Sequence, residues 1–286
     1  MNYAITGATG HFGQSAVKNL LNLVNDNDNV IAIVRNIDKG SKVFPNGLKL
    51  RQGNYDNEES MEKALENVDR LLFISSQPGS KTSRNIQHKN VVKALKNAGI
   101  KFVAYTSFPE AQNSPSSLSA DHKLTENLIK ESGIAYSFLR NNWYLENEIG
   151  FLKSGEADQT ALYWANNNSG WALEREYAEA AAKVLTANDP KQVYEFAGAS
   201  RSYEDLGEAL KKATGNDITI KQITRDEYIK HLESTGLDNN TAALFASFQE
   251  PIDDGALNEN STDLQKTLGH DLTDLPDAIK EILNRG

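Results

Sequence analysis

Apolar and polar positions follow two different patterns over the first half of the chain. Short apolar runs have the length and β-branched content of strands buried on both faces, and the segments between them repeat apolar residues at helical spacing. The predicted strands are 3–5, 30–34, 48–50, 71–74, 102–106 and 135–139, and the predicted helices are 14–24, 58–65, 85–98 and 118–131. This alternation predicts an α/β fold in which helices cover both faces of a parallel sheet.

The pattern of apolar and polar positions changes after about residue 150. A polar, asparagine-rich stretch at 155–170 precedes helix and strand patterns that are shorter and separated by longer loops. We therefore expect residues 1–150 to form the larger domain and residues 151–286 to form a smaller, mostly helical lobe that binds a substrate. One segment at about 190–198 has a strand pattern and is expected to return to the main sheet.

A glycine-rich turn separates the first predicted strand from the first predicted helix, with glycines at positions 7, 10 and 13. Gly7 allows a sharp turn out of the strand, Gly10 lets the backbone approach a pyrophosphate, and Gly13 lets the helix pack closely on the sheet. The free N–H groups of a helix N-terminus attract phosphate. The pattern therefore predicts a Rossmann-type, doubly wound sheet that binds a dinucleotide, and the alternative is a purely structural turn.

The residue type at the end of the second predicted strand indicates whether NADH or NADPH is bound. NAD-specific folds usually place Asp or Glu there, where it bonds the ribose hydroxyls. Here the strand ends Val34-Arg35-Asn36, and Asp38 comes later. The planar cation of Arg35 suits a 2′-phosphate, so we expect NADPH, with NADH as the alternative cofactor. The alternative for Arg35 is an exposed arginine without a ligand.

Composition narrows the classes of function. The 286 residues include 30 Lys and Arg against 39 Asp and Glu, a net charge of -9, which disfavours nucleic acid as a partner. There is no cysteine, and the five histidines form no i, i+4 pair, so we expect no metal site. No apolar run approaches the ~20 residues of a membrane helix. We expect a cytoplasmic protein with no membrane partner.

Several segments together resemble a known family. They are 5–10, 31–36, 71–76, 101–107, 132–136 and 139–147. On these segments the chain resembles the NmrA-like atypical short-chain dehydrogenases/reductases, and within that group the type-2 NAD(P)H:quinone oxidoreductases. Segment 139–147 is the most restricted of these matches, and the resemblance extends over almost the whole chain.

The resemblance implies NADPH-dependent reduction of quinones by direct hydride transfer, without a flavin, in a protein that forms a homodimer. Asn142 is the first candidate for a hydrogen bond to the quinone oxygen or to the nicotinamide carboxamide, and Tyr144 is the second. Ser107 lies where the site continues after the fifth strand. The residues expected to bind the cofactor are Gly7, Ala8, Thr9, Gly10, His11, Phe12, Arg35, Ser75, Ser76, Gln77, Thr106, Asn141 and Trp143.

The chain lacks the proton-donating residues that are common in the wider group of short-chain reductases. Many short-chain reductases use a Tyr-x-x-x-Lys pair, but none of the ten tyrosines here is followed by lysine four residues later. His122 is a candidate to steer or protonate the quinone oxygen near neutral pH, and the alternative is a helix-face histidine without a role. The missing pair favours a second hypothesis, a redox sensor that binds a dinucleotide and regulates a protein partner without turnover. A third is reduction of another carbonyl or action on a sugar nucleotide.

Five aromatic residues lie between positions 143 and 171, around the change in the pattern, and two interpretations of them are open. They form either the apolar face on which a quinone ring stacks or ordinary packing between the two lobes. The residues are Trp143, Tyr144, Tyr163, Trp164 and Trp171.

Overall fold

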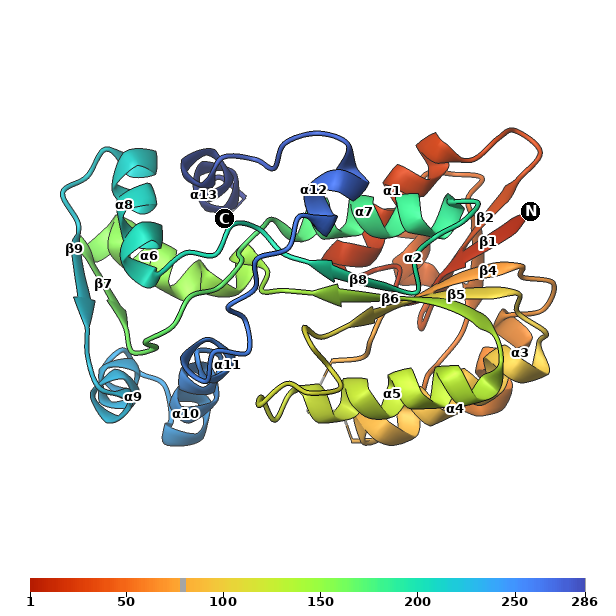
Figure 1. Ribbon diagram of the computed structural model, residues 1–286, viewed down its shortest axis with the longest axis horizontal. Helices are drawn as coiled ribbons and strands as arrows, with labels where there is room; N and C mark the ends of the chain where they lie inside the picture. Colours follow the sequence, from red (N-terminus) through yellow and green to blue (C-terminus); the bar gives the residue numbers. More distant parts are fainter. Residues whose placement is uncertain (78–80, 286) are drawn as a thin grey trace.

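The computed structural model describes residues 1–77 and 81–285, which form a seven-stranded parallel sheet and a second, smaller lobe (Figure 1). Every neighbouring pair in the main sheet is parallel, and the strand order is β3-β2-β1-β4-β5-β6-β8. The strands are β1 (Asn2–Ile5), β2 (Asn29–Val34), β3 (Lys49–Gln52), β4 (Arg70–Phe73), β5 (Phe102–Ser107), β6 (Ala135–Asn141) and β8 (Val193–Phe196).

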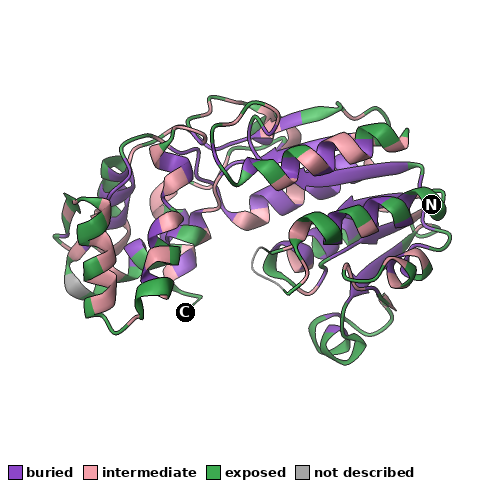
Figure 2. Ribbon diagram, turned by 90° about the horizontal axis from the view of Figure 1, so that it is seen from below, coloured by how far each residue is buried: buried purple, intermediate pink, exposed green. Residues whose placement is uncertain are grey.

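Helices cover both faces of this sheet, as the sequence predicts (Figure 1). One face carries α1 (His11–Leu23), α7 (Glu174–Thr186) and α12 (Asp263–Leu268), and the other carries α3 (Glu58–Ala64), α4 (Arg84–Asn97) and α5 (Ser119–Ser132). Each face has its own apolar cluster, and the inner strands β1, β2, β4 and β5 between them are buried almost throughout, whereas the edge strand β3 is not (Figure 2). The predicted Rossmann-type fold is thus confirmed, and its strand order reverses between β1 and β4. Ligands of such sheets bind outside the carboxyl ends of the strands at that point.

The second lobe packs around buried aromatic side chains. The rings of Tyr163 and Tyr203 stack with centroids 4.8 Å apart, and Trp171 meets Tyr203 edge-on at 5.3 Å. Its elements are η1 (Leu145–Glu148), α6 (Ile149–Asp158), β7 (Thr160–Tyr163), α8 (Tyr203–Thr214), β9 (Thr219–Gln222), α9 (Arg225–Ser234), α10 (Asn239–Ser247), α11 (Glu250–Asp253) and α13 (Leu275–Leu283). Strands β7 and β9 form a separate parallel pair.

Two short elements lack the hydrophobic pattern that would reveal them in the sequence. In β7, only Ala161 and Tyr163 are buried, which is too few alternating positions to predict a strand. The helix α2 (Ile37–Val43) buries only Gly40. It begins where the side chain of Asn36 accepts a hydrogen bond from the Lys39 backbone N–H at 2.9 Å. A capping contact rather than an apolar face therefore starts this helix.

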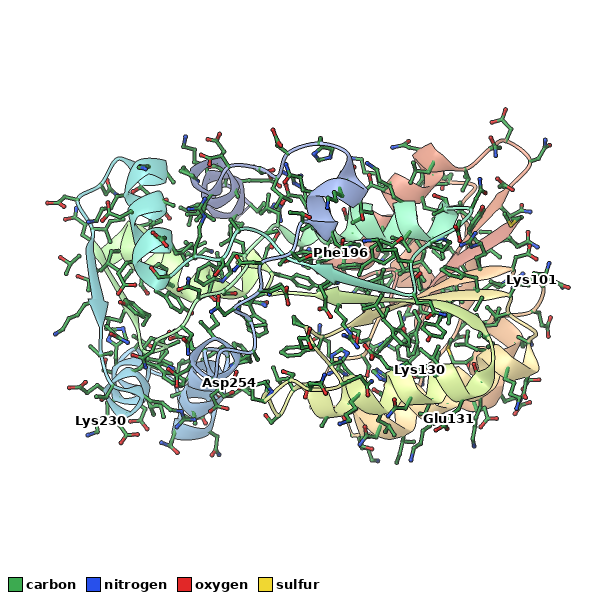
Figure 3. All side chains as sticks on the ribbon, viewed as in Figure 1. Lys101, Lys130, Glu131, Phe196, Lys230 and Asp254 are labelled. Carbon is green, nitrogen blue, oxygen red and sulfur yellow. The ribbon has the colours of Figure 1, made fainter. Side chains whose placement is uncertain are left out.

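The chain crosses between the two lobes more than once. After η1, α6 and β7 it returns through α7 to the sheet, where β8 pairs with β6. The late helix α12 packs on α7 and β8. A single boundary at residue 150 therefore does not separate the two lobes in space. Phe196, which ends β8, lies where the lobes meet, whereas Lys101, which precedes β5, lies at the opposite edge of the sheet (Figure 3). The carboxyl ends of the strands thus face the second lobe.

Candidate functional site

The turn between β1 and α1 has the conformation that its glycines predict. Gly7 adopts φ +60°, and the Gly10 N–H donates to the Gly7 carbonyl at 3.0 Å. A Cβ on Gly13 would lie 2.4 Å from the Gly7 oxygen and 2.6 Å from the Cα of Ala8, so no larger residue fits there. No side chain caps α1 at Gly10, and its first turn contains no acidic residue. Its N–H groups and positive dipole end therefore suit an anion. We call residues 7–13 the glycine turn.

Side chains around the glycine turn differ in their accessibility. His11 and Gly10 are exposed, Thr9 and Gln14 are half-buried, and Phe12 is buried. The Gln14 side chain donates to the Thr9 carbonyl at 2.9 Å, which fixes the far side of the turn. The Phe12 ring lies 6.0 Å from the ring of Tyr144, so this side chain packs against the segment that follows β6.

Arg35 directly follows β2, and its side chain is exposed. Its carbonyl accepts a hydrogen bond from Gln52 at 3.2 Å, which joins it to β3. No acidic side chain forms an ion pair with its guanidinium in the part of the chain that the structure describes. The neighbouring Asn36 is used to cap α2. Arg35 thus offers an exposed cation at the carboxyl end of β2, and its contact with a phosphate stays a prediction.

The loop that follows β4 is held by side chains from several elements. The hydroxyl of Thr6 accepts the Ile74 N–H at 3.1 Å, and the Tyr55 hydroxyl donates to the Ile74 carbonyl at 2.8 Å. The Ser75 N–H donates to the Thr106 hydroxyl at 2.9 Å. These bonds bring Ser75 and Thr106 together at the carboxyl edge of the sheet, where the sequence predicts both.

Ser76 and Gln77 complete this loop. The Ser76 N–H donates to Nε2 of His88 on α4 at 3.0 Å. Gln77 is exposed. His88 was not expected to touch the site, because a buried histidine on an amphipathic helix looks like any other core position in the sequence. Its spacing of four residues from Arg84 on the same helix face is the only sequence signal for the network described below.

Asn141 and Tyr144 form a pair where β6 ends. The Asn141 Nδ2 donates to the Tyr144 hydroxyl at 2.9 Å, whereas the buried Asn141 Oδ1 accepts no hydrogen bond from any described residue. Burial raises the pKa of the Tyr144 phenol, so the phenol keeps its proton. The Tyr144 ring also packs 5.1 Å from that of Tyr177. The pair therefore presents an unsatisfied acceptor and a protonated hydroxyl next to the glycine turn.

Asn142 has a different environment from its neighbour. Its Oδ1 accepts the backbone N–H groups of Trp143 at 2.8 Å and Gly170 at 3.0 Å, and its Nδ2 donates to the Leu257 carbonyl at 3.0 Å. The residue is 3% exposed. Its amide is thus engaged in joining β6 to the second lobe, and the geometry favours this structural role over the expected contact with a quinone.

Trp143 and Trp171 bind one buried carboxyl in the second lobe. Their indole N–H groups donate to Oε1 of Glu148 at 3.1 and 3.2 Å, and the Tyr203 hydroxyl donates to its Oε2 at 2.8 Å. Burial raises the pKa of Glu148 to about 7, although the three donors act against that rise. Trp143 therefore reaches into the lobe.

The aromatic side chains mainly pack inside the second lobe. Tyr163, Trp164 and Trp171 are 3%, 8% and 5% exposed. The Trp164 indole donates to the Ala246 carbonyl at 3.0 Å. Of the two interpretations of these residues, internal packing is the correct one for these three.

His122 belongs to a buried network of side chains. Its Nε2 lies 3.0 Å from Nη2 of Arg84, and its Nδ1 lies 3.0 Å from the Tyr105 hydroxyl. Because arginine only donates, Nε2 accepts and the proton sits on Nδ1. Burial, then the charge of Arg84, holds the pKa of His122 well below its usual range. The lowered pKa disfavours His122 as a proton donor near neutral pH, and a role for it in catalysis stays a prediction.

The same network includes His88 on α4. Its Nδ1 lies 2.7 Å from the hydroxyl of Thr125, which itself donates to the Asp121 carbonyl. Burial lowers the pKa of His88 to about 3, and the nearby charge of Arg84 adds to this effect. We call this set the histidine network, and its members are Arg84, His88, Tyr105, His122 and Thr125.

Comparison with known proteins identifies the family. Residues 7–168 match the model of a family described as NAD(P)H-binding. The chain belongs to this NAD(P)H-binding family. The chain is 34% identical to quinone oxidoreductase 2 of Escherichia coli strain K12 over 98% of both chains. It is 26% identical to an NmrA-like family domain-containing oxidoreductase of Aspergillus flavus over 99% of this chain and 95% of that protein.

Solved structures of NAD(P)H-binding relatives superpose closely. An NADPH complex of the NADPH-dependent quinone oxidoreductase from Escherichia coli gives a TM-score of 0.90 at 33% identity, over 99% of this chain and 100% of that one. The triphenylmethane reductase of a Citrobacter species also gives 0.90, at 32% identity and the same coverage. These relatives are oxidoreductases, and the comparisons support NAD(P)H-dependent oxidoreduction for this chain.

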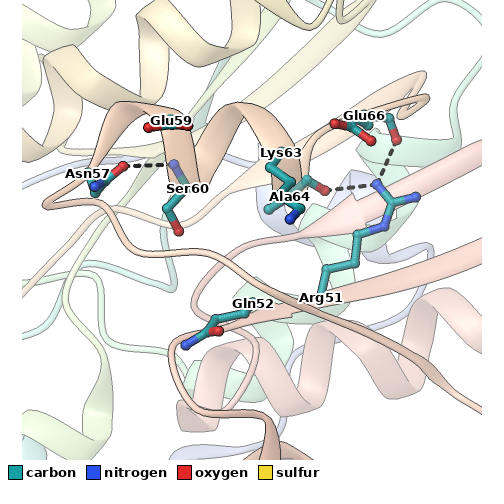
Figure 4. A pocket seen from close by; sticks show the side chains of 8 residues that line it. All are labelled: Arg51, Gln52, Asn57, Glu59, Ser60, Lys63, Ala64 and Glu66. Carbon is teal, nitrogen blue, oxygen red and sulfur yellow. Dashed lines mark hydrogen bonds between the residues drawn. The ribbon is translucent and has the colours of Figure 1, made fainter.

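A surface hollow of about 610 Å³ lies elsewhere, at the β3 edge of the sheet beside α3 (Figure 4). Arg51 spans it and donates to the carbonyls of Ala64 at 2.9 Å and Glu66 at 2.6 Å. None of its lining residues belongs to the glycine turn, the Asn141–Tyr144 pair or the histidine network. The hollow is therefore separate from the carboxyl edge of the sheet, where the sequence predicts the dinucleotide.

Two further features concern clusters of metal-ligating side chains and long apolar helices. Within residues 1–77 and 81–285, no three His, Asp or Glu side chains gather as ligands for a metal ion. No helix in the same ranges combines the length and the apolar character needed to cross a bilayer.

Proposed function

We propose that this protein reduces quinones with NADPH by direct hydride transfer, without a flavin. The observation that carries the proposal is the Asn141–Tyr144 pair, whose free acceptor and protonated hydroxyl lie against the glycine turn. The relative with 34% identity over nearly the full length is itself named a quinone oxidoreductase. Together they support a site where a dinucleotide and a planar carbonyl acceptor meet.

Each end of the proposed site has its own binding groups. The backbone N–H groups at the start of α1 hold the pyrophosphate, and Arg35 pairs with the 2′-phosphate that distinguishes NADPH from NADH. At the other end, the unsatisfied Oδ1 of Asn141 accepts a hydrogen bond from the nicotinamide carboxamide. Ser75, Ser76 and Thr106 border the ribose from the neighbouring strand ends.

Tyr144 takes the place that Asn142 was expected to fill. Since Nδ2 of Asn141 donates to the Tyr144 oxygen, one lone pair of that oxygen is occupied and its own hydrogen is free to point outward. The phenol then donates to the acceptor oxygen. When bound, NADPH supplies the hydride, and this chain contributes by positioning the two reactants and by its fixed polar groups.

A spectrophotometric assay tests the proposal. Purified protein without added flavin is mixed with NADPH or NADH and a panel of benzoquinones and naphthoquinones, and oxidation of the reduced nicotinamide is followed by its near-ultraviolet absorbance. We expect rapid oxidation that requires the quinone and prefers NADPH. Oxidation that appears only after a flavin is added contradicts direct transfer.

A sensor without turnover is the second candidate. It is favoured by the missing Tyr-x-x-x-Lys pair together with the neutral His122, which leaves no strong acid in the histidine network. Tight NADPH binding with no quinone consumed in the same assay would replace the first proposal with this one. A homodimer and a cytoplasmic location stay predictions.

A further inference from the structure

Arg84 belongs to the histidine network and begins the helix that follows β4. It is the first residue of α4, which follows the loop after β4, so it lies at the carboxyl edge of the sheet. Burial raises the pKa of Tyr144, and the charge of Arg84 acts against that rise. Arg84 contacts His122, whose ring lies 6.0 Å from that of Phe108. Phe108 belongs to the apolar cluster of the second lobe.

The histidine network fixes the direction of the guanidinium. Nη2 of Arg84 donates to Nε2 of His122 at 3.0 Å, and the opposite ring nitrogen of His122 is held by Tyr105 at 3.0 Å. Tyr105 is fully buried between the neighbouring strands. Because the imidazole is neutral, it orients the arginine without balancing its charge.

The charge of Arg84 is not balanced by a carboxylate. No described acidic side chain forms an ion pair with it, and its buried Nε has no hydrogen-bond partner among the described residues. Glu126, a buried carboxylate on α5, is bound instead by Arg140 at 2.8 Å. A partly buried arginine with an unused donor and no counter-ion is costly unless a ligand supplies the negative charge.

We propose that Arg84 stabilises the negative charge that develops on the acceptor oxygen, and that His122 is the positioning residue that holds it there. This inference rests on the proposed quinone reduction. The C4–H bond of NADPH breaks as its hydrogen and electron pair bond to the acceptor, so the dinucleotide is oxidised and the acceptor oxygen carries one negative charge until water protonates it. A fixed cation at that oxygen replaces the absent acid, since it stabilises the charge rather than delivering a proton.

A charge-removing variant tests the inference in single-turnover kinetics. In Arg84→Met at saturating NADPH, we expect the hydride-transfer rate to fall by about 10²-fold, the usual effect of removing one oxyanion donor. We expect the dissociation constant for NADPH to stay unchanged, and free guanidinium in solution to restore part of the rate. If Arg84 had only a structural role, added guanidinium would not restore the rate of Arg84→Met. The rate would then also not fall while the dissociation constant for NADPH stays unchanged. The matched control is Lys89→Met, which removes a cation from the exposed side of the same helix.

A binding experiment separates this inference from the proposed function. 4-Nitrophenol absorbs visible light when ionised, so its titration can be followed on the NADP⁺-bound protein without turnover. We expect bound nitrophenol to ionise at lower pH in the wild-type protein and in Lys89→Met, but not in Arg84→Met. Quinone turnover with no difference between Arg84→Met and wild type, or bound nitrophenol with an unshifted titration, overturns the role of Arg84. A shifted titration without quinone turnover overturns the proposed function and leaves the oxyanion site standing.

Discussion

The glycine turn and the Asn141–Tyr144 pair lie at the same edge of one sheet but differ in what determines their shape. In the turn, the backbone does so: Gly7 adopts a left-handed conformation, and Gly13 has no room for a side chain. The pair depends on side chains, because a hydrogen bond joins Asn141 to Tyr144 and ring contacts from two helices hold the phenol.

This difference teaches how each part of the site responds to change. A backbone site depends on a few positions where only glycine fits, and it tolerates variation elsewhere. A side-chain site depends on many contacts, and each substitution removes only some of them. The predictions below test that contrast, beginning with the change expected to have the largest effect.

Replacing Gly13 by alanine should disrupt the backbone site. The new Cβ would lie 2.4 Å from the Gly7 oxygen, so α1 must shift away from the turn. We expect a loss of about 1–3 kcal/mol in the free energy of unfolding, which is typical of overpacking, and no measurable NADPH binding by fluorescence titration. Gly150→Ala is the matched control, because no atom lies within 4 Å of its added Cβ. Normal NADPH binding by Gly13→Ala would show that the turn does not hold the phosphates.

Replacing Glu148 by glutamine should change how stability depends on pH. Burial raises the pKa of this carboxyl from 4.5 to about 7 in the folded protein, so the folded state binds the proton more tightly. Its contribution to the free energy of unfolding therefore falls as pH rises from about 4.5 to about 7, by roughly 3 kcal/mol, and is constant above that range.

Glutamine keeps an acceptor for both indoles, and its amide can donate to the Tyr203 oxygen. We expect Glu148→Gln to lose this pH dependence and to be more stable than wild type in urea unfolding at alkaline pH. Urea curves whose difference between the two proteins is the same at all pH values would contradict a raised pKa at Glu148.

Alanine variants of Asn141 and Asn142 should have different effects, one on turnover and the other on stability. Asn142→Ala leaves the Gly170 N–H and the Leu257 carbonyl without partners in a buried place, so we expect a loss of about 1–3 kcal/mol in urea unfolding. Asn141→Ala removes an amide whose Oδ1 is already unsatisfied. It should unfold nearly as the wild type does but reduce quinone slowly at saturating NADPH. Slow quinone reduction by Asn142→Ala with normal stability would instead support a role of Asn142 in the reaction.

Arg35→Ala should have the smallest effect on the folded protein, because the side chain is exposed. Charge-assisted hydrogen bonds contribute about 1.5–3 kcal/mol, so we expect NADPH to bind at least about tenfold more weakly. Binding of NADH, which lacks the 2′-phosphate, serves as the internal control and should be unchanged. Equal weakening for both dinucleotides would place Arg35 at the shared part of the cofactor.

The glycine turn could be predicted from sequence because its determinants are local. Three glycines, a strand before them and a helix after them lie within a short stretch of chain. The different environments of Asn141 and Asn142 could not be predicted in the same way. They depend on the Leu257 carbonyl and on Gly170, which come from distant segments of the second lobe.

The histidine network shows the same limit. His122 stood out as a polar residue on a helix, but its neutral state follows from Arg84 on another helix and from burial against Tyr105 on β5. Apart from the four-residue spacing of Arg84 and His88, the sequence contains these residues at separate places without any spacing that joins them. Side-chain pairs between elements therefore had to come from the structure, whereas the sheet and its helices follow from periodicity.

The late return of the chain to the sheet has a consequence for synthesis on the ribosome. Six strands of the main sheet are complete once Asn141 has emerged, but the open edge of β6 stays unpaired until β8, at Val193–Phe196, follows. The apolar face of α1 likewise waits for α7. The nascent chain therefore exposes the edge of β6 for about fifty residues of elongation, several seconds at ordinary translation speeds. The apolar face of α1 is exposed for longer, because α1 ends at Leu23 and α7 begins only at Glu174. During this time the chain is most open to chaperones and to aggregation.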